Sequence, residues 1–188
     1  MLVAVCTAVS CRKPPSYPEE IAAHRAETDE FMRNGSESPI PREQRATFQP
    51  LAYYPIDEQY RVPAALRVAR GDEVIEMSTS TGQARRMRRV GTLAFTLKGQ
   101  PLTLTAFAEI DDTNLRRLFV PFGDLTNGMA TYQGGRYLDL DLRGSGVYDL
   151  DFNRAYHPYC VFNPQYECPV PPRENRLKVP ILSGERLR

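Results

Sequence analysis

The clearest pattern in this sequence is an alternation of apolar and polar residues between positions 66 and 152. A period of two residues is typical of strands that bury one face. Ahead of it, residues 16–34 have a helical period, which the Ser16-Tyr17-Pro18-Glu19 capping-box spacing opens and Gly35 closes. One helix followed by a run of strands is therefore expected.

The alternating region divides into short strands separated by turn residues. Lys98-Gly99 lies between two such segments and favours a hairpin. Residues 115–122 form another strand. The predicted strands are residues 66–68, 73–80, 90–97, 102–108, 115–122, 137–143 and 147–152.

The strictest alternation is in residues 137–143. Leu138, Leu140 and Leu142 should point inward, and the charged residues between them outward. Gly144-Ser145-Gly146 should then turn this strand back to pair with the next one.

About seven strands after one helix predict a mainly β fold, either an antiparallel barrel or a sandwich-like roll. The chain has 188 residues, of which 41% are hydrophobic and 25% charged, as expected for one globular domain. We expect this domain to cover residues 16–188, behind a leader and tether at 1–15. The Pro- and Tyr-rich residues 36–63 should form an ordered, irregular wrap around it.

The net charge of +1 gives no reason to expect binding to nucleic acid or to an anionic membrane surface. The one basic run, Arg85-Arg86-Met87-Arg88-Arg89, is local. A solvated strand or turn explains it, and a phosphate-binding patch is the alternative.

The first residues resemble an export signal. Leu2 to Ser10 are apolar but too few to span a bilayer. Ala8-Val9-Ser10-Cys11 resembles a lipobox, although Ala8 stands where Leu is usual, and a polar, proline-containing tether follows. We expect Cys11 to carry lipid and to be the only attachment to the membrane, in the cell envelope. An ordinary, cleaved or disordered leader, and a cytoplasmic protein, is the alternative.

The remaining cysteines agree with export. Once Cys6 leaves with the leader and Cys11 carries lipid, Cys160 and Cys168 remain as an even pair, which predicts a disulfide in an oxidising compartment. Their spacing is not a zinc signature and neither histidine completes one, so no metal site is expected.

Polar motifs gather between residues 123 and 156. Gly134 and Gly135, ahead of Arg136, would let another backbone or a ligand approach closely. Pairing of the last two strands would bring Arg136 beside Asp151 and Asn153, as a ligand site or as a structural ion pair. The ligand-binding candidates are Asp124, Thr126, Tyr132, Arg136, Asp151, Asn153 and Tyr156.

Two long blocks carry a family resemblance: PFGDLTNGMATYQGGRYLDL and DLDFNRAYHPYCVFNPQYECPVPPRENRLKVPILSGE. With Phe48-Gln49-Pro50-Leu51 and Ser78-Thr79-Ser80-Thr81-Gly82, they resemble the bacterial and archaeal domain of unknown function family DUF1684, over nearly all of the chain after the leader. Family members often have Asn where His157 stands, which argues against His157 as an indispensable ligand or base. The family brings no established activity, so it implies no catalytic residues and no cofactor.

Our first hypothesis for the function is a binding module on the cell envelope. It would hold a small polar or anionic ligand with Arg136, Tyr132 and Asn153, as the polar motifs suggest.

The alternative hypothesis is a hydrolase, with Asp124 or Asp151 as general base and Thr126 or Tyr132 as a polar partner. No nucleophile–base pair stands out in the sequence to support it. A barrel that binds flavin or another cofactor is a third possibility, which rests on analogy between folds alone.

Overall fold

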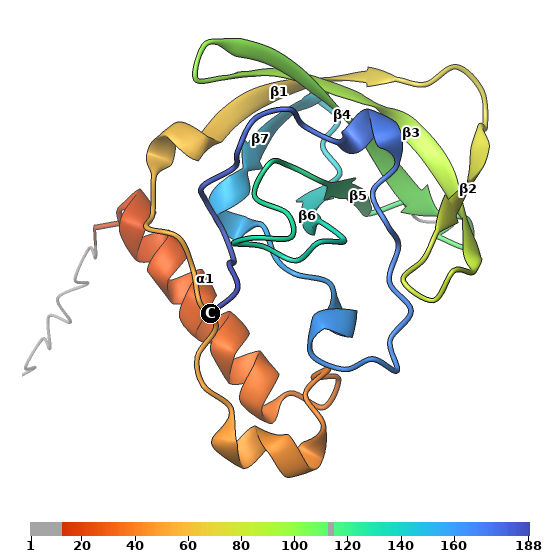
Figure 1. Cartoon of the computed structure of the whole chain (residues 1–188). Helices are drawn as coiled ribbons and strands as arrows, with labels where there is room; N and C mark the ends of the chain where they lie inside the picture. Colours follow the sequence, from red (N-terminus) through yellow and green to blue (C-terminus); the bar gives the residue numbers. More distant parts are fainter. Residues whose placement is uncertain (1–12, 113–114) are drawn as a thin grey trace, which may run out of the picture.

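Seven strands form one antiparallel sheet that curls into a nearly closed barrel (Figure 1). The computed structural model describes residues 13–112 and 115–188. The strand order is β6-β5-β4-β3-β1-β7, and β2 pairs with β3 beside this path. The strands are β1 Arg61–Val68, β2 Val74–Ser78, β3 Ala84–Leu97, β4 Gln100–Glu109, β5 Arg117–Phe122, β6 Arg136–Asp141 and β7 Val147–Asp151.

All seven predicted strands are present, and the antiparallel barrel is confirmed. The hairpin at Lys98-Gly99 is also confirmed, because Leu97 pairs with Gln100 across it. The first strand begins five residues earlier than predicted, at Arg61. Pro63 concealed this start. It pairs with Asp149 of β7, whereas pairing of β1 with β3 starts only at Ala64, so the missing N–H of the proline interrupts no bond to β3.

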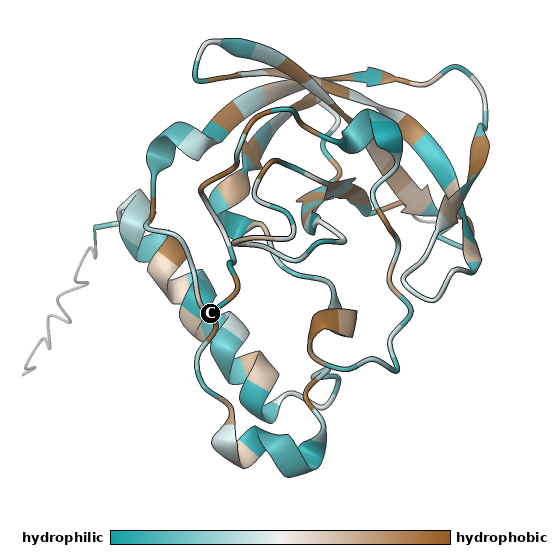
Figure 2. Ribbon diagram, viewed as in Figure 1, coloured by the Kyte–Doolittle hydropathy of each residue, from teal (hydrophilic) through white to brown (hydrophobic). Residues whose placement is uncertain are grey.

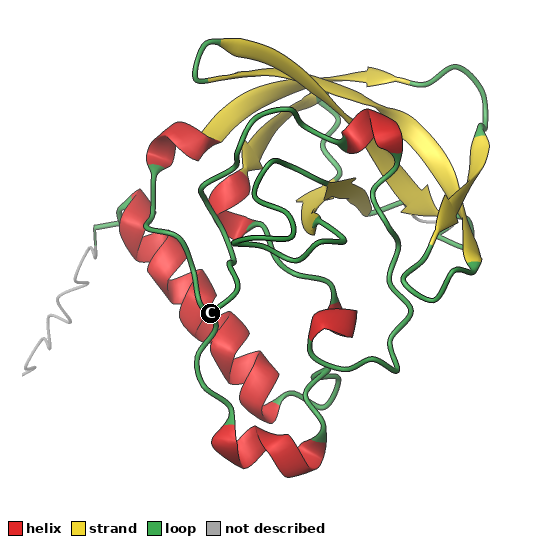
Figure 3. Ribbon diagram, viewed as in Figure 1, coloured by secondary structure: helices red, strands yellow, loops and turns green. Residues whose placement is uncertain are grey.

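The predicted N-terminal helix is α1, Tyr17–Asn34. Its first turn has the expected capping box, in which the backbone N–H of Ser16 donates to the carboxylate of Glu19 over 2.7 Å. The other helices are single 3-10 segments (Figure 3). They are η1 Arg42–Thr47, η2 Glu58–Tyr60, η3 Phe152–Arg154, η4 Tyr159–Val161 and η5 Arg173–Asn175.

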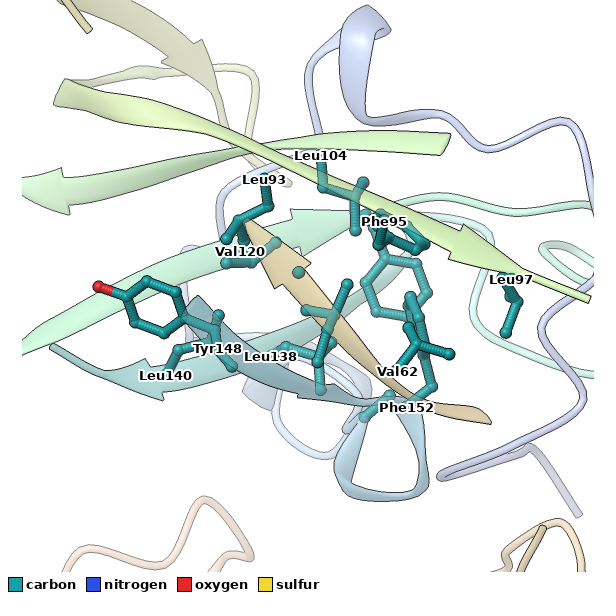
Figure 4. Packing of buried hydrophobic residues seen from close by; sticks show 14 of the residues in the cluster. Val62, Leu93, Phe95, Leu97, Leu104, Val120, Leu138, Leu140, Tyr148 and Phe152 are labelled. Carbon is teal, nitrogen blue, oxygen red and sulfur yellow. The ribbon is translucent and has the colours of Figure 1, made fainter. Parts of the chain in front are cut away.

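The hydrophobic core fills the interior of the barrel (Figure 4). Apolar and polar residues alternate along the strands (Figure 2) and place the apolar side chains inside. Phe152, just after β7, packs its ring against Phe95 and Phe122 at centroid distances of 5.8 and 5.3 Å. On β3 the alternate residues Leu93, Phe95 and Leu97 are all buried and form its inward face.

The predicted pairing of the last two strands is wrong. β6 pairs with β5, and β7 pairs with β1, so the two strands lie at opposite ends of the sheet order. The first half of β1, which the sequence pattern did not reveal, supplies β7 with its partner. β6 also ends at Asp141, so Leu142 lies beyond the strand and is 44% exposed instead of pointing inward.

The predicted ordered wrap is confirmed where it joins the helix to the C-terminal segment. The backbone N–H of Leu51 donates to Asp29 of α1 over 2.7 Å. Two residues later, Tyr53 forms a β-bridge with Glu185, and the N–H of Tyr54 donates to the carbonyl of Gly184. The C-terminus therefore ends beside α1 (Figure 1).

The predicted leader, its lipobox and Cys11 lie outside the described residues. In the described ranges, no helix is long and apolar enough to cross a membrane.

Candidate ligand-binding groove

Arg136 is a buried structural residue. Its guanidinium lies 3.0 Å from Asp124 in an ion pair whose two side chains are both 0% exposed. It also donates to the backbone carbonyls of Ile181, Ser183 and Glu185. One arginine thus fixes the C-terminal segment to the barrel, and its donors are directed away from solvent.

The close backbone approach predicted for the glycines before Arg136 is confirmed at Gly135. A Cβ built there would lie 2.5 Å from the carbonyl oxygen of Phe122, and the φ angle is +94°. The contact that requires glycine is therefore made with the protein's own backbone.

Asp151 and Asn153 belong to a different cluster from Arg136. Asp151 accepts a hydrogen bond from the hydroxyl of Tyr17 over 2.8 Å and pairs with Arg154 at 3.5 Å. Asn153 exchanges two hydrogen bonds with the backbone of Asp57. These contacts fasten α1 and the wrap to the end of β7. The expected cleft that joins Arg136 to Asp151 and Asn153 is not formed.

Besides Asp124, the candidates in the 123–135 loop are Thr126 and Tyr132, and both make local contacts. The hydroxyls of Thr126 and Thr131 lie 2.7 Å apart and are buried. Tyr132 donates its backbone N–H to His157 over 3.3 Å, and its hydroxyl lies 3.9 Å from the sulfur of Cys160.

The two candidate disulfide cysteines are neighbours. The backbone N–H of Cys160 donates to the sulfur of Cys168 over 3.2 Å, and both residues are free thiols in the structure. The disulfide stays a prediction. No group of three or more potential metal-ligating side chains gathers in residues 13–112 and 115–188.

A groove of about 660 Å³ lies between α1 and the barrel. One wall is α1, which contributes His24, Thr28 and Phe31. The facing wall comes from β5, β6 and the segment after η3, and Glu185 lies in the lining. Of the predicted ligand-binding candidates, Asn153 and Tyr156 line this groove.

A buried carboxyl–imidazole pair forms part of the groove lining. The backbone N–H of His157 donates to Oε2 of Glu185 over 2.7 Å, and the ring Nδ1 lies 3.4 Å from the same oxygen. Because Nε2 accepts from the N–H of Tyr132, the network assigns the ring proton to Nδ1. The two side chains are only 3% and 5% exposed.

Burial keeps both members of this pair uncharged near neutral pH. Loss of hydration raises the pKa of Glu185 to about 8, with Asp29 adding to the rise and His157 and Arg136 opposing it. The same loss of hydration, helped by Arg136, lowers the pKa of His157 to about 3. A carboxylic acid and a neutral imidazole therefore face the groove together.

Gly184 puts Glu185 in this position. Its φ angle is +77°, and a Cβ there would lie 2.6 Å from the carbonyl oxygens of Phe152 and Ala155. The backbone N–H of Glu185 then donates to the carbonyl of Ala155. A side chain at Gly184 would displace the segment that carries Glu185.

A second carboxyl group, on Asp139 of β6, lies further along the groove. It accepts a hydrogen bond from the hydroxyl of Tyr156 over 2.8 Å. Although Asp139 is open to solvent at its edge, surrounding protein raises its pKa above the ordinary value. Burial, with Asp139 adding to it, also raises the pKa of Tyr156, so this phenol keeps its proton.

Comparison with known proteins places these features in a family. Residues 46–186 match the family described as "Protein of unknown function (DUF1684)". The chain belongs to the DUF1684 family. A solved structure that is similar to this DUF1684 chain is the solution NMR structure of an uncharacterized protein of Haloarcula marismortui, with 40% sequence identity and a TM-score of 0.70. The similarity covers 89% of this chain and 92% of that chain. No curated protein matches.

The family match contains only part of the groove. Glu185, His157 and Asp139 lie within the matched DUF1684 region, whereas α1 precedes it. The groove residues that sequence reasoning missed are Glu185, Asp139 and His24. The one feature of the sequence that pointed to Glu185 was the preceding Gly184, because glycine is common where the backbone needs a positive φ angle.

Proposed function

We propose that this DUF1684 protein binds a small polar molecule in the groove between α1 and the barrel. The observation that carries the proposal is the groove itself, with a volume of about 660 Å³ and Glu185 and His157 in its lining. Ligand sites commonly have volumes of roughly 300–1,000 Å³ and combine apolar walls with a few polar groups. A buried carboxyl group with a perturbed pKa is typical of such sites.

The residues that we propose to hold the ligand match the predicted candidates only in part. Arg136 is occupied by Asp124 and three carbonyls, and Asn153 is occupied by Asp57 and Tyr17. We assign the contacts to Tyr156, which was among the predicted candidates, and to Glu185 and Asp139, which were not. Without a free arginine donor from Arg136, the argument for an anionic ligand loses its support.

A thermal-shift screen of neutral, cationic and anionic small molecules tests this proposal. Compounds that bind the groove should raise the melting temperature of the wild type. Glu185→Gln should weaken that rise, whereas Glu76→Gln, an exposed change on β2, should leave it intact. If every compound that binds acts equally on both variants, the groove is not the site.

We further propose that the domain works in the cell envelope, tethered through lipid on Cys11. The support is the small-residue sequence before Cys11 and the basic, proline-containing segment after it. A groove that binds a small molecule outside the cytoplasm would suit a tethered domain.

Hydrolysis of the bound molecule is a second candidate function. One observation favours it: Glu185, whose pKa is about 8, holds a proton near neutral pH, as a general acid must. Asp139 in the same groove would be the second carboxyl group. Release of product from a panel of ester and glycoside substrates, lost in Glu185→Gln and kept in Glu76→Gln, would support this function.

A further inference from the structure

We propose that the ligand of the groove is an organic cation, a small molecule that carries an ammonium group. This inference rests on the proposed function and names the chemical class of its ligand. It is carried by two features of the lining: an excess of carboxyl groups without basic partners, and a concentration of aromatic rings.

The groove lining contains more carboxyl groups than arginines. Five carboxyl groups and three arginines line the groove. Each arginine already lies 3.2 to 3.6 Å from a carboxylate. Asp139, Glu167 and Glu185 form no ion pair with an arginine or lysine anywhere in the described parts of the chain. The arginine pairs are Arg85–Glu109, Arg117–Asp141 and Arg154–Asp151.

The histidines do not balance this excess. Burial lowers the pKa of His24, and Arg154 beside it adds to the effect, while the pKa of His157 is about 3. Both rings are therefore neutral near pH 7. Glu185 also holds its proton near pH 7, so the negative charges of the lining without an arginine partner are those of Asp139 and Glu167. These two carboxylates favour the entry of a cation over that of an anion.

Aromatic side chains supply the apolar part of the lining. Eight tyrosine and phenylalanine rings line the groove: Phe31, Tyr53, Phe119, Tyr137, Tyr156, Tyr159, Phe162 and Tyr166. Ring pairs Tyr137–Tyr156 and Tyr159–Tyr166 stand at 89° and 85°. Cations bind over the faces of aromatic rings. Because the two rings of each pair are nearly perpendicular, their faces point in different directions and could contact an ammonium group from more than one side.

The protein already uses one of these rings to hold a cation. The guanidinium of Arg25 lies 4.4 Å from the centroid of the Tyr53 ring. Tyr53 also forms the β-bridge with Glu185. A cation–π contact therefore already exists at the edge of the groove, on the residue that pairs with Glu185.

Glu185 has one oxygen available for the cation. The hydrogen bond from the backbone N–H of His157 and the contact with the His157 ring both go to Oε2, and no partner for Oε1 is found among the residues that the structure describes. The charged or titratable groups around it are His157, Arg136, Asp29 of α1 and Tyr53 of the wrap. An ammonium group at Oε1 would favour the carboxylate form and release a proton. Binding should therefore tighten as the pH rises toward 8.

Titration calorimetry with two matched pairs of probes tests the inference. Choline is compared with 3,3-dimethyl-1-butanol, its neutral counterpart of the same shape, and butylammonium with 1-butanol. We expect each ammonium compound to bind about tenfold more tightly than its neutral counterpart, in keeping with a desolvated cation–π and carboxylate contact. We also expect choline affinity to rise several-fold between pH 6.5 and pH 8.5.

Variants locate the effect. Glu185→Gln should remove most of the preference for choline over its neutral counterpart, and the control Glu76→Gln should retain it. Equal binding of charged and neutral probes would overturn the cation inference while leaving the groove as a ligand site. Binding of the neutral counterparts alone would do the same. Absence of binding by these four probes and by every compound of the thermal-shift screen would overturn both proposals.

Discussion

Arg136 and Asp124 form an ion pair of 3.0 Å from which solvent is fully excluded. The pair connects the start of β6 to the loop after β5, and Arg136 also binds three carbonyls of the C-terminal segment. Asp124 in turn accepts from the N–H of Ile181 over 3.2 Å. Both residues therefore fix the backbone of residues 181–185, which places Glu185 in the groove lining. Neither Arg136 nor Asp124 lines the groove itself.

Arg136→Ala should therefore lower the free energy of unfolding by roughly 3–5 kcal/mol, because it leaves the Asp124 carboxylate buried and unpaired. Urea denaturation measures this loss. Arg117→Ala is the matched control, since the Arg117–Asp141 pair is exposed on both sides and should contribute less than about 1 kcal/mol. Equal effects of the two substitutions would contradict a structural role for Arg136.

Glu185 should make the protein less stable as the pH rises from 6.5 to 8. The carboxyl group has a pKa of about 8 in the fold, above its ordinary value of 4.5, so the folded state binds a proton that the unfolded state has lost. His157, whose pKa falls from 6.5 to about 3, affects stability only below pH 6.5, where stability falls as the pH falls. The interval above pH 6.5 thus isolates Glu185.

Urea denaturation at pH 6.5 and pH 8.5 measures this dependence. The wild type should lose on the order of 2 kcal/mol between the two values, by linkage over this interval. Glu185→Gln should lose much less, and Glu76→Gln should behave as the wild type. The same slope in Glu185→Gln would show that another group titrates.

Cys160 and Cys168 should form a disulfide in protein isolated from the envelope. Their backbone and sulfur atoms are already in contact, and a loop of this size would stabilise the fold by roughly 2–3 kcal/mol. Burial raises the pKa of Cys168 to about 11, so the thiolate is scarce and formation should need a catalyst of thiol oxidation. Thiol counting in denaturant, without reductant, is the measurement. Two free thiols in envelope protein would refute the bond.

Cys11 should carry lipid in the mature protein. Intact mass of membrane-extracted protein is expected to show a diacylglyceryl group on Cys11, and Cys11→Ser should release the protein from the membrane fraction. A protein that retains Met1 and stays in the aqueous fraction would contradict the proposed tether.

The period of two residues was enough to predict the strands, because one buried face imposes it wherever a strand forms. It could not predict which strands pair. The partner of β7 is the half of β1 that contains Pro63, and a proline in a strand conceals its own pattern. The turn at Gly144-Ser145-Gly146 therefore suggested a hairpin that the barrel does not contain.

The groove was harder to predict than the barrel. Glutamate side chains are ordinarily exposed, and Glu185 becomes buried because the C-terminal segment pairs with the wrap at Tyr53. Arg136 was found from its glycines, but its partner, Asp124, depends on a loop conformation. Burial of single polar residues follows from contacts between distant segments, which local sequence patterns do not encode.

The most direct test of the groove as a cation site is the ¹H–¹⁵N NMR spectrum of the labelled protein during titration with choline chloride. The amide signals of Thr28, Tyr156, His157 and Glu185 should shift together and saturate at one dissociation constant. Sodium chloride at the same ionic strength should not move them. Shifts confined to residues outside the groove, or no saturable shift, would contradict the account.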